Sequence, residues 1–289
     1  MSGAGSGQAP RQKPVVSMEK AQRARRRFIR SVMLLAGVVG ASLLGVVPVF
    51  RAHARRLRPP GALDEKDFLA SCIKCGQCLQ VCPVSAIQLG DLDEGVGVGA
   101  PFIAAREQGC DFSCDAAQCI LACPTGALTY TKPDFFPTRE GAGLSRLPVL
   151  KARADEPEPT LNLRERMGLA RLTRPEACLA MQGKGFSGPV RDAAFKGRMR
   201  YMDVDRWKPI PVRDHPYERE LCDLCVTECP IDDAIALEAF TDTDGSRRFR
   251  PVVREQCVGC GVCEMICPAE PAAIEIEARA TWAANGEGA

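Results

Sequence analysis

Four short aliphatic segments recur along the chain, and each one begins shortly after a Cys-Pro pair. In every case the pair is followed by a polar turn, an alanine and an aliphatic residue, a pattern that predicts the start of a short β-strand. Residues 239–249 extend the third segment and predict a hairpin with its turn at Asp244-Gly245. The four expected strands are Ala86-Ile-Gln-Leu, Ala127-Leu-Thr-Tyr, Ala234-Ile-Ala-Leu-Glu and Ala273-Ile-Glu-Ile-Glu.

Short helical turns are expected beside these strands. Each repeat carries two cysteines four positions apart, and that spacing places both on one face of a helical turn. These pairs are Cys78/Cys82, Cys119/Cys123, Cys225/Cys229 and Cys263/Cys267. Residues 131–216 carry few motifs: 155–159 indicate a linker, 183–189 a flexible loop, and Leu161 to Leu172 a short helix.

A basic segment and then a long apolar stretch, residues 31–50, lie near the amino terminus. The segment Arg25-Arg26-Arg27-Phe28-Ile29-Arg30 resembles the twin-arginine export signal. Ala52-His53-Ala54 fits the A-x-A cleavage pattern, so we expect cleavage after Ala54 and a periplasmic product. An uncleaved membrane anchor is the alternative, because about 20 apolar residues can span a bilayer.

Charge and composition argue against some classes of partner and of metal site. Residues 1–54 carry nine Lys or Arg and one acid, whereas residues 55–289 carry 29 basic and 35 acidic residues. A negative body argues against nucleic acid as a partner. Aromatic content is 6%, and only two histidines are present, which argues against a His-rich zinc or copper enzyme. Metal–thiolate bonds are therefore expected to supply part of the stability.

Fifteen of the sixteen cysteines fall into four runs that each end in Cys-Pro. The first run, 72–83, and the last, 257–268, read C-x2-C-x2-C-x3-C-P, the cysteine spacing of bacterial ferredoxins with [4Fe–4S] clusters. The second run is irregular and the third holds only three cysteines. We expect four [4Fe–4S] clusters and a carrier rather than an enzyme, since sixteen ligands leave no iron open to a substrate.

The fourth cysteine of a run is expected to ligate the other cluster of a pair, as in two-cluster ferredoxins. Cys82 lies 28 positions before Cys110, and Cys229 lies 28 positions before Cys257. These equal spacings favour pairing runs one and two, and runs three and four. Nested pairing, of runs one with four and two with three, is the alternative.

Cys178 is the one cysteine outside the runs, and it completes the sixteen ligands that four clusters need. A free buried thiol beside a three-ligand or [3Fe–4S] site is the alternative for Cys178. The expected iron ligands are Cys72, Cys75, Cys78 and Cys123 for cluster 1, Cys110, Cys114, Cys119 and Cys82 for cluster 2, Cys178, Cys222, Cys225 and Cys267 for cluster 3, and Cys257, Cys260, Cys263 and Cys229 for cluster 4.

These elements predict an α+β fold with two ferredoxin-like dicluster units of short helices and β-hairpins, joined by long irregular loops. We expect a signal peptide at 1–54 and a first dicluster domain at 55–135. A linker or insertion that carries Cys178 should occupy 136–216. The second dicluster domain should occupy 217–280, followed by a tail at 281–289.

Other functions fit the cysteines less well. Structural zinc does not need a third cysteine two residues on, nor Cys-Pro after three more. Cysteines two or three residues apart are poor candidates for orderly disulfide bridges, although their number is even. No nucleophile with a positioned base and no phosphate-binding loop stands out. A zinc-stabilised or disulfide-stabilised structural or assembly protein is the alternative of a different class.

The twin-arginine segment together with Arg58-Pro-Pro-Gly-Ala-Leu, Phe68-Leu-Ala-Ser-Cys72 and Cys178-Leu-Ala-Met-Gln-Gly resembles the ferredoxin-type NapG/MauM family. The resemblance implies a periplasmic four-cluster protein. It also implies that electrons come from a membrane-bound quinol-oxidising partner and pass to a periplasmic redox partner, in nitrate reduction or in methylamine utilisation. Residues 184–221 separate Gln182-Gly183 from Cys222 and form an insertion relative to the family pattern.

Overall fold

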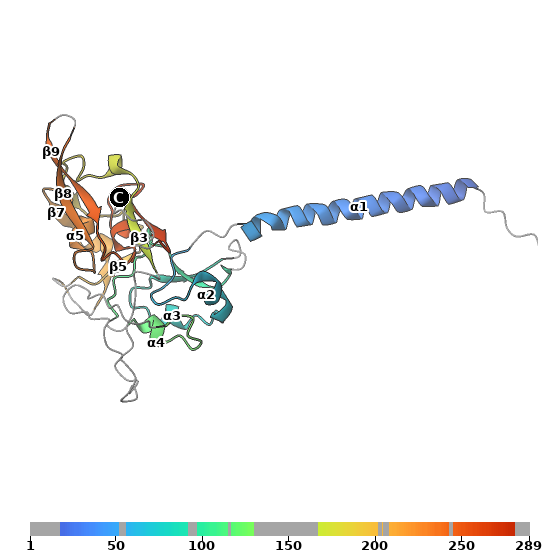
Figure 1. Cartoon of the computed structure of the whole chain (residues 1–289), viewed down its shortest axis with the longest axis horizontal. Helices are drawn as coiled ribbons and strands as arrows, with labels where there is room; N and C mark the ends of the chain where they lie inside the picture. The colour runs from blue at the N-terminus through green and yellow to red at the C-terminus, as the bar shows by residue number, and fades with distance from the viewer. Residues whose placement is uncertain are drawn as a thin grey trace, which may run out of the picture. The chain divides into compact units, whose positions relative to one another are not determined.

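The computed structural model describes residues 18–51, 56–91, 97–114, 117–129, 167–201, 204, 208–242 and 245–280 (Figure 1). Contacts divide the chain into two compact units, residues 1–52 and residues 53–289. We call the second unit the body. Its residues 56–129 form the N-terminal half, and its residues 167–280 form the C-terminal half.

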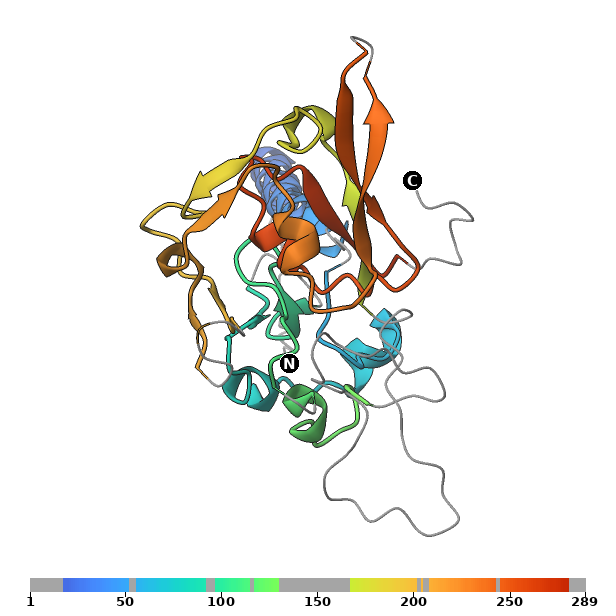
Figure 2. The ribbon, with the colours of Figure 1, turned by 90° about the vertical axis from the view of Figure 1, so that its left-hand side faces the viewer.

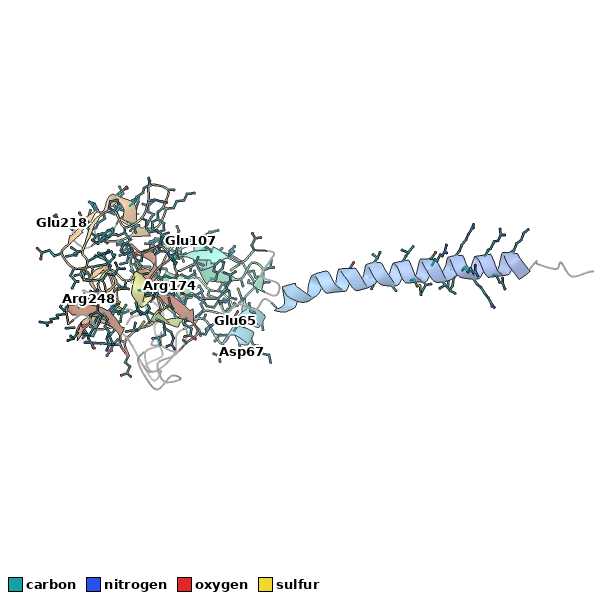
Figure 3. All side chains as sticks on the ribbon, turned by 90° about the horizontal axis from the view of Figure 1, so that it is seen from above. Glu65, Asp67, Glu107, Arg174, Glu218 and Arg248 are labelled. Atoms are coloured by element: carbon teal, nitrogen blue, oxygen red, sulfur yellow. The ribbon has the colours of Figure 1, made fainter. Side chains whose placement is uncertain are left out.

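The described part of the first unit is one long helix, α1 (Met18–Arg51). The arginines expected in the export signal, Arg25, Arg26 and Arg27, lie on it and are exposed, and exposed apolar side chains such as Leu34 and Leu35 follow (Figure 3). Within the residues that the structure describes, no helix has the length and apolar character that crossing a membrane requires. The expected cleavage position after Ala54 lies outside the described residues.

The N-terminal half is built from short elements. They are α2 (Glu65–Ser71), α3 (Gln77–Gln80), β1 (Ile87–Leu89), β2 (Pro101–Ile103) and α4 (Gln118–Leu121). Strands β1 and β2 pair antiparallel, with Gln88 opposite Phe102. An antiparallel bridge joins Ala62, before the first cysteine run, to Leu128, after the second. The half is thus closed by contacts between its two ends.

The C-terminal half repeats this plan with longer strands. Its elements are β3 (Gly168–Leu172), η3 (Pro175–Ala177), α5 (Leu224–Thr227), β8 (Ile235–Thr241), β9 (Arg247–Val253), α6 (Val262–Met265) and β10 (Ile274–Ala278). Strands β8 and β9 form an antiparallel hairpin, and β10 pairs antiparallel with β3. The β10–β3 pair occupies the place of the Ala62–Leu128 bridge in the first half.

Residues 184–221 interrupt the repeat with elements of their own. They contain β4 (Phe186–Gly188), β5 (Arg198–Met199), β6 (Ile210–Pro211), η4 (Val212–Asp214) and β7 (Tyr217–Arg219). Strand β4 pairs with β7, and β5 pairs with β6. Tyr201 stacks on His215 with ring centroids 3.9 Å apart, and the hydroxyl of Tyr217 donates to that of Tyr201 at 3.1 Å. The insertion therefore has packed structure of its own.

Most of the predicted strands are confirmed. The segments after Cys82, Cys229 and Cys267 form β1, β8 and β10, and the predicted hairpin is the β8–β9 pair. The segment after Cys123 forms only the single bridge at Leu128, and residue 130 lies outside the described residues. The helix predicted for 161–172 is wrong for residues 168–172, which form β3 because β10 offers them a strand edge. Residues 161–166 lie outside the described residues.

The two halves of the body lie against each other in the ribbon (Figure 2), and one continuous apolar core joins them. Phe68 and Phe112 of the N-terminal half and Met265 and Ile266 of the C-terminal half belong to the same buried cluster. The four-residue helices are too short to be stable alone, and α3 packs on α4 as α5 packs on α6. Packing, rather than helix propensity, therefore holds the cysteine-bearing turns.

Candidate functional site

The four short helices position the cysteines in the same way. Each carries the last but one cysteine of a run at its second residue, and the last cysteine follows two residues after the helix ends. The residue before α3, α4 and α6 has a positive φ: Gly76 (74°), Ala117 (46°) and Gly261 (91°). This left-handed residue turns the chain sharply, so that the cysteines before and after it can face a common point.

The structure brings together the four cysteines expected for cluster 1, which we call site 1. Burial raises the pKa of the Cys78 thiol to about 11, and the neighbouring Cys72, Cys75 and Cys123 raise it further through their charges. Cys75 is exposed, whereas Cys78 is buried. Site 1 therefore lies at the surface of the N-terminal half.

Site 2 combines Cys82 with three cysteines of the second run. A cavity is lined by Cys82, Cys110, Cys114 and Cys119 and by apolar side chains that include Ile87. Burial raises the pKa of Cys110 and Cys119 well above the usual thiol value, and the charges of the nearby cysteines add to this effect. The run-two cysteines thus face Cys82 despite their irregular spacing.

Site 3 gathers the four cysteines that are most scattered in the sequence. Cys178, Cys222, Cys225 and Cys267 line one cavity together with Leu172 and Leu224. Burial raises the pKa of Cys222 to about 11, and the charges of Cys178 and Cys267 raise it further. The insertion after Cys178 therefore leaves that residue beside the other three.

Site 4 is the most deeply enclosed. Its cavity is lined by Cys229, Cys257, Cys260 and Cys263, and all four are buried. Burial raises the pKa of Cys260 and Cys263 well above the usual thiol value, with further increases from the neighbouring thiolates. A thiolate is costly in such a cavity unless a metal centre compensates its charge.

Cys178 has the same local backbone as Cys72. Each follows a short helix, α2 or η3, and ends it in an extended conformation, with φ −74° and ψ 113° at Cys72 and φ −73° and ψ 118° at Cys178. The Cys178 N–H donates to Pro175 O at 3.1 Å, as the Cys72 N–H donates to Phe68 O at 2.9 Å. By its place in the repeat, Cys178 is therefore the first cysteine of the third run.

Backbone N–H groups donate to several of these sulfur atoms. Two of the donors immediately precede strands β1 and β10, and the third is the bridge residue Leu128: Ala86 donates to Cys82 Sγ at 3.2 Å, Ala273 to Cys267 Sγ at 3.4 Å and Leu128 to Cys123 Sγ at 3.4 Å. The Ala170 N–H donates to Cys257 Sγ at 3.4 Å. The recurring alanine after Cys-Pro was visible in the sequence, but the sequence did not show that Ala86 and Ala273 donate to sulfur.

The effect of these donors is seen at Cys123. Burial acts to raise the pKa of this thiol, but hydrogen bonds from the backbone of Leu128 and from Thr125 outweigh it, and the pKa is lowered. Donors that favour the thiolate also favour metal binding, because the thiolate is the ligand.

The cysteine sets fit a polynuclear centre better than a single ion. All sixteen cysteines are described, and none of them forms a disulfide bond. Zinc would draw its sulfur ligands to about 2.3 Å from one point. Four sulfurs around an apolar cavity suit the larger iron–sulfur cubane, whose iron atoms each take one thiolate.

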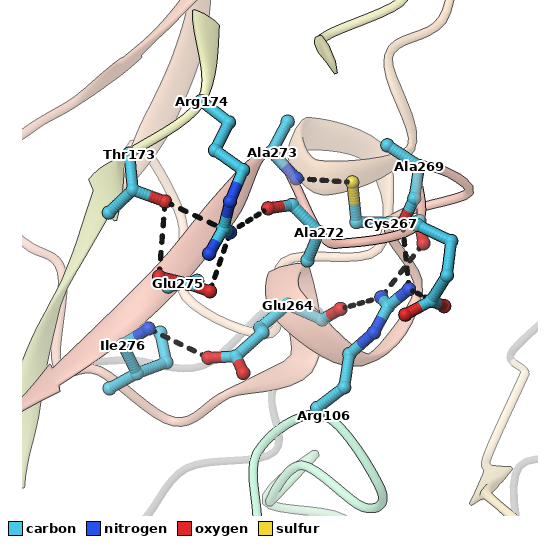
Figure 4. A network of polar contacts seen from close by, with 11 residues as sticks. Arg106, Thr173, Arg174, Glu264, Cys267, Ala269, Ala272, Ala273, Glu275 and Ile276 are labelled. Carbon is cyan, nitrogen blue, oxygen red and sulfur yellow. Dashed lines mark hydrogen bonds and ion pairs between the residues drawn. The ribbon is translucent and has the colours of Figure 1, made fainter.

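Arg106, which the sequence did not single out, joins the two halves beside site 3 (Figure 4). Its guanidinium donates to the carbonyl oxygens of Glu264 at 2.6 Å, Cys267 at 2.9 Å and Ala269 at 2.7 Å, and to the Glu270 carboxylate at 2.8 Å. The hydrogen bond from Arg106 to this carboxylate, together with the Arg106 charge, holds the pKa of Glu270 below its usual value. Arg106 thus fixes the turn that carries the last Cys-Pro from a position 161 residues away in sequence.

Two cysteine-rich parts of the chain match known iron–sulfur families. The family described as 4Fe-4S dicluster domain matches residues 71–127, and the family described as 4Fe-4S binding domain matches residues 254–270. The chain therefore contains 4Fe–4S binding domains.

Curated relatives match over most of the chain. The ferredoxin-type protein NapG of Escherichia coli (strain K12) is 33% identical over 264 residues, which cover 89% of this chain and 87% of the relative. The methylamine utilization ferredoxin-type protein MauM of Methylorubrum extorquens is 32% identical over 258 residues, 87% of this chain and 88% of the relative. MauM of Paracoccus denitrificans is 31% identical over 270 residues, which cover 90% of this chain and 92% of the relative. No solved structure matches the chain.

Proposed function

Because the chain belongs to the family of ferredoxin-type NapG and MauM proteins, we propose that it relays electrons through four [4Fe–4S] clusters in the periplasm. The observation that carries this proposal is the grouping of the sixteen cysteines into four sets of four. Three of the sets line apolar cavities. The fourth, site 1, is a set of mutually interacting thiols.

We assign one cluster to each site, with the fourth cysteine of every run exchanged within a half. The proximity of Cys82 to the second run and of Cys123 to the first supports pairing of runs one and two. The dicluster match at 71–127 supports the same pairing. Likewise Cys229 lines the cavity of the fourth run and Cys267 that of the third. Nested pairing would instead require the exchange of cysteines between runs one and four and between runs two and three.

The protein's own residues bind the clusters, orient them and limit access of water. A [4Fe–4S] cluster, when bound, supplies reversible one-electron oxidation and reduction. The apolar walls of sites 2 and 4, including Phe112 and Val258, keep solvent from the sulfur atoms. The backbone donors Ala86, Ala170 and Ala273 stabilise the negative charge on the thiolates. Hydrogen bonding and burial of this kind tune the reduction potential of such centres.

The proposed donor is a membrane-bound quinol-oxidising protein, and the proposed acceptor is a periplasmic oxidoreductase of the nitrate-reductase type. Electron transfer in a methylamine-utilisation system is a second candidate, favoured by the nearly equal identity to MauM, 32% against 33% for NapG. The exposed Arg25, Arg26 and Arg27 on α1 support export by the twin-arginine route. Membrane contact would then run through the partner or through an uncleaved signal.

Electron transfer from quinol tests this proposal. Anaerobically purified protein is mixed with membranes from the organism that makes it, quinol is added, and the visible iron–sulfur absorbance is followed. We expect quinol-dependent bleaching that reverses when the soluble periplasmic fraction and nitrate are added. For the second candidate, re-oxidation would not depend on nitrate. Protein that dithionite reduces reversibly but quinol with membranes does not would contradict the proposed donor.

A further inference from the structure

The two halves of the body touch directly at their cysteine loops. The Cys110 N–H, in site 2, donates to the Cys260 carbonyl, in site 4, at 2.9 Å. Beside this bond, Gly109 packs closely against the backbone of Gly261 and Val262. A Cβ at position 109 would come within 2.6 Å of Val262 N and 2.7 Å of Gly261 C. The Gly109 N–H also donates to Met265 Sδ at 3.3 Å. The polypeptide therefore brings ligands of site 2 and site 4 into main-chain contact.

Within each half, the two sites are also neighbours. Cys78 of site 1 and Cys119 of site 2 lie close enough for their charges to interact, and α3 packs against α4. In the same way Cys225 of site 3 and Cys263 of site 4 interact, and α5 packs against α6. The contacts between sites thus run in the order 1, 2, 4, 3.

Solvent exposure is lowest at the two middle sites of this series and higher at the two end sites. All four cysteines of site 4 are buried, and two of the four in site 2 are buried, Cys110 and Cys119. Site 1 and site 3 each have only one buried cysteine, Cys78 and Cys178. At site 1, Cys75 is exposed and Ile73 beside it is 64% exposed. The sites at the ends of the contact series are therefore the ones that a partner could approach.

We propose that the contact between the Gly109-Cys110 and Cys260-Gly261 loops joins the two halves into one electron path, with sites 1 and 3 as its ends. This inference rests on the proposed function. Each passage across the contact moves one electron, so that the centre on one side is oxidised by one electron and that on the other is reduced by one. No bond forms or breaks. Sites 1 and 3 then face different redox partners, and sites 2 and 4 stay internal.

Removal of an end site tests the order by electron paramagnetic resonance of the fully reduced protein. In Cys75→Ala, which disables site 1, site 2 should keep a magnetic neighbour in site 4. The spectrum should then contain no simple, uncoupled signal. In the control Cys114→Ala, which disables site 2, site 1 loses its neighbour and an uncoupled signal should appear. Each variant should retain about 12 of about 16 iron atoms, because each cubane holds four.

An uncoupled signal in Cys75→Ala at that iron content would overturn the single path, because it would mean that sites 2 and 4 do not interact. The proposed function would stand in that case. A wild-type protein without iron would instead overturn the proposed function. If Cys75→Ala converts site 1 rather than emptying it, Cys222→Ala at site 3 provides the same comparison.

A second variant examines the contact itself. Gly109→Val, added to Cys75→Ala, should push the two loops apart and produce the uncoupled signal that Cys75→Ala alone lacks. Gly245→Asn, a substitution in the open turn of the β8–β9 hairpin, serves as the matched control and should leave the spectrum of Cys75→Ala unchanged. Identical spectra for the Gly109→Val and Gly245→Asn proteins, at equal iron content, would contradict the assigned crossing point.

Discussion

At the scale of single residues, Cys178 shows how a distant thiol reaches a ligand position. It is separated from Cys222 by the insertion, yet both line the cavity of site 3 with Cys225 and Cys267. Its backbone angles repeat those of Cys72, the first cysteine of the first run. A residue with the geometry and the surroundings of a ligand is expected to act as one.

Substitution of Cys178 should therefore cost iron. In Cys178→Ser, we expect a loss of about four iron atoms per chain, or about one if site 3 becomes a [3Fe–4S] centre. Cys222→Ser, at the same site, is the reference and should lose a similar amount. Iron analysis with electron paramagnetic resonance measures both. Full iron content and an unchanged spectrum in Cys178→Ser, with loss in Cys222→Ser, would remove Cys178 from the ligand set.

At the scale of elements, the insertion is attached to site 2. The buried Gln108 side chain donates to Arg198 O at 2.8 Å and accepts from the Arg198 N–H at 2.7 Å, so it pairs with β5 as a strand would. The Arg200 N–H donates to the Asp111 carboxylate at 3.1 Å. The segment expected as a linker thus covers the loop that carries Cys110.

Truncation of the Gln108 side chain should loosen the attachment of β5 to the loop that carries Cys110. In Gln108→Ala, two backbone groups of Arg198 lose their partner, at a cost of about 1–3 kcal/mol. Hydrogen exchange at the Arg198 amide should accelerate, while iron content stays constant. Gln182→Ala, whose side chain makes an exposed hydrogen bond to Glu176 O, should leave that amide unchanged. Equal exchange in wild type and Gln108→Ala would show that the insertion is held by other contacts.

The elements also show what the sequence could predict. Cysteine spacing identified the helical turns, and the Ala-aliphatic pattern identified β1, β8 and β10, because both signals are local. Strand β3 was missed, since Gly168–Leu172 is a strand only through its pairing with β10, more than a hundred residues away. The long-range hydrogen bonds of Gln108 and Arg106 were also missed, because a single polar residue gives no periodic signal in the sequence.

At the scale of the whole molecule, the two halves belong to one compact body. They share one apolar core, and Arg106 of the N-terminal half binds the turn after Cys267 in the C-terminal half. Arg279 of the C-terminal half donates in return to the Leu63 carbonyl at 2.8 Å. Such reciprocal contacts hold the cluster sites of the two halves at fixed positions relative to one another. An electron path between the sites requires this.

Loss of Arg106 should loosen this relation. Arg106→Met leaves three carbonyl oxygens without that donor and should destabilise the body by roughly 1–3 kcal/mol. The midpoint of guanidinium-induced loss of iron–sulfur absorbance should fall. Arg250→Met, an exposed position on β9, is the matched control. A midpoint unchanged from that of the control would show that the Arg106 contacts contribute little to holding the halves together.

The most direct test of the central claim is the content of iron and acid-labile sulfide in protein purified without oxygen. Four [4Fe–4S] clusters predict about 16 iron and about 16 sulfide per chain, in a brown protein. A colourless protein that contains zinc, or one whose cysteines have oxidised in pairs with no labile sulfide, would contradict the account.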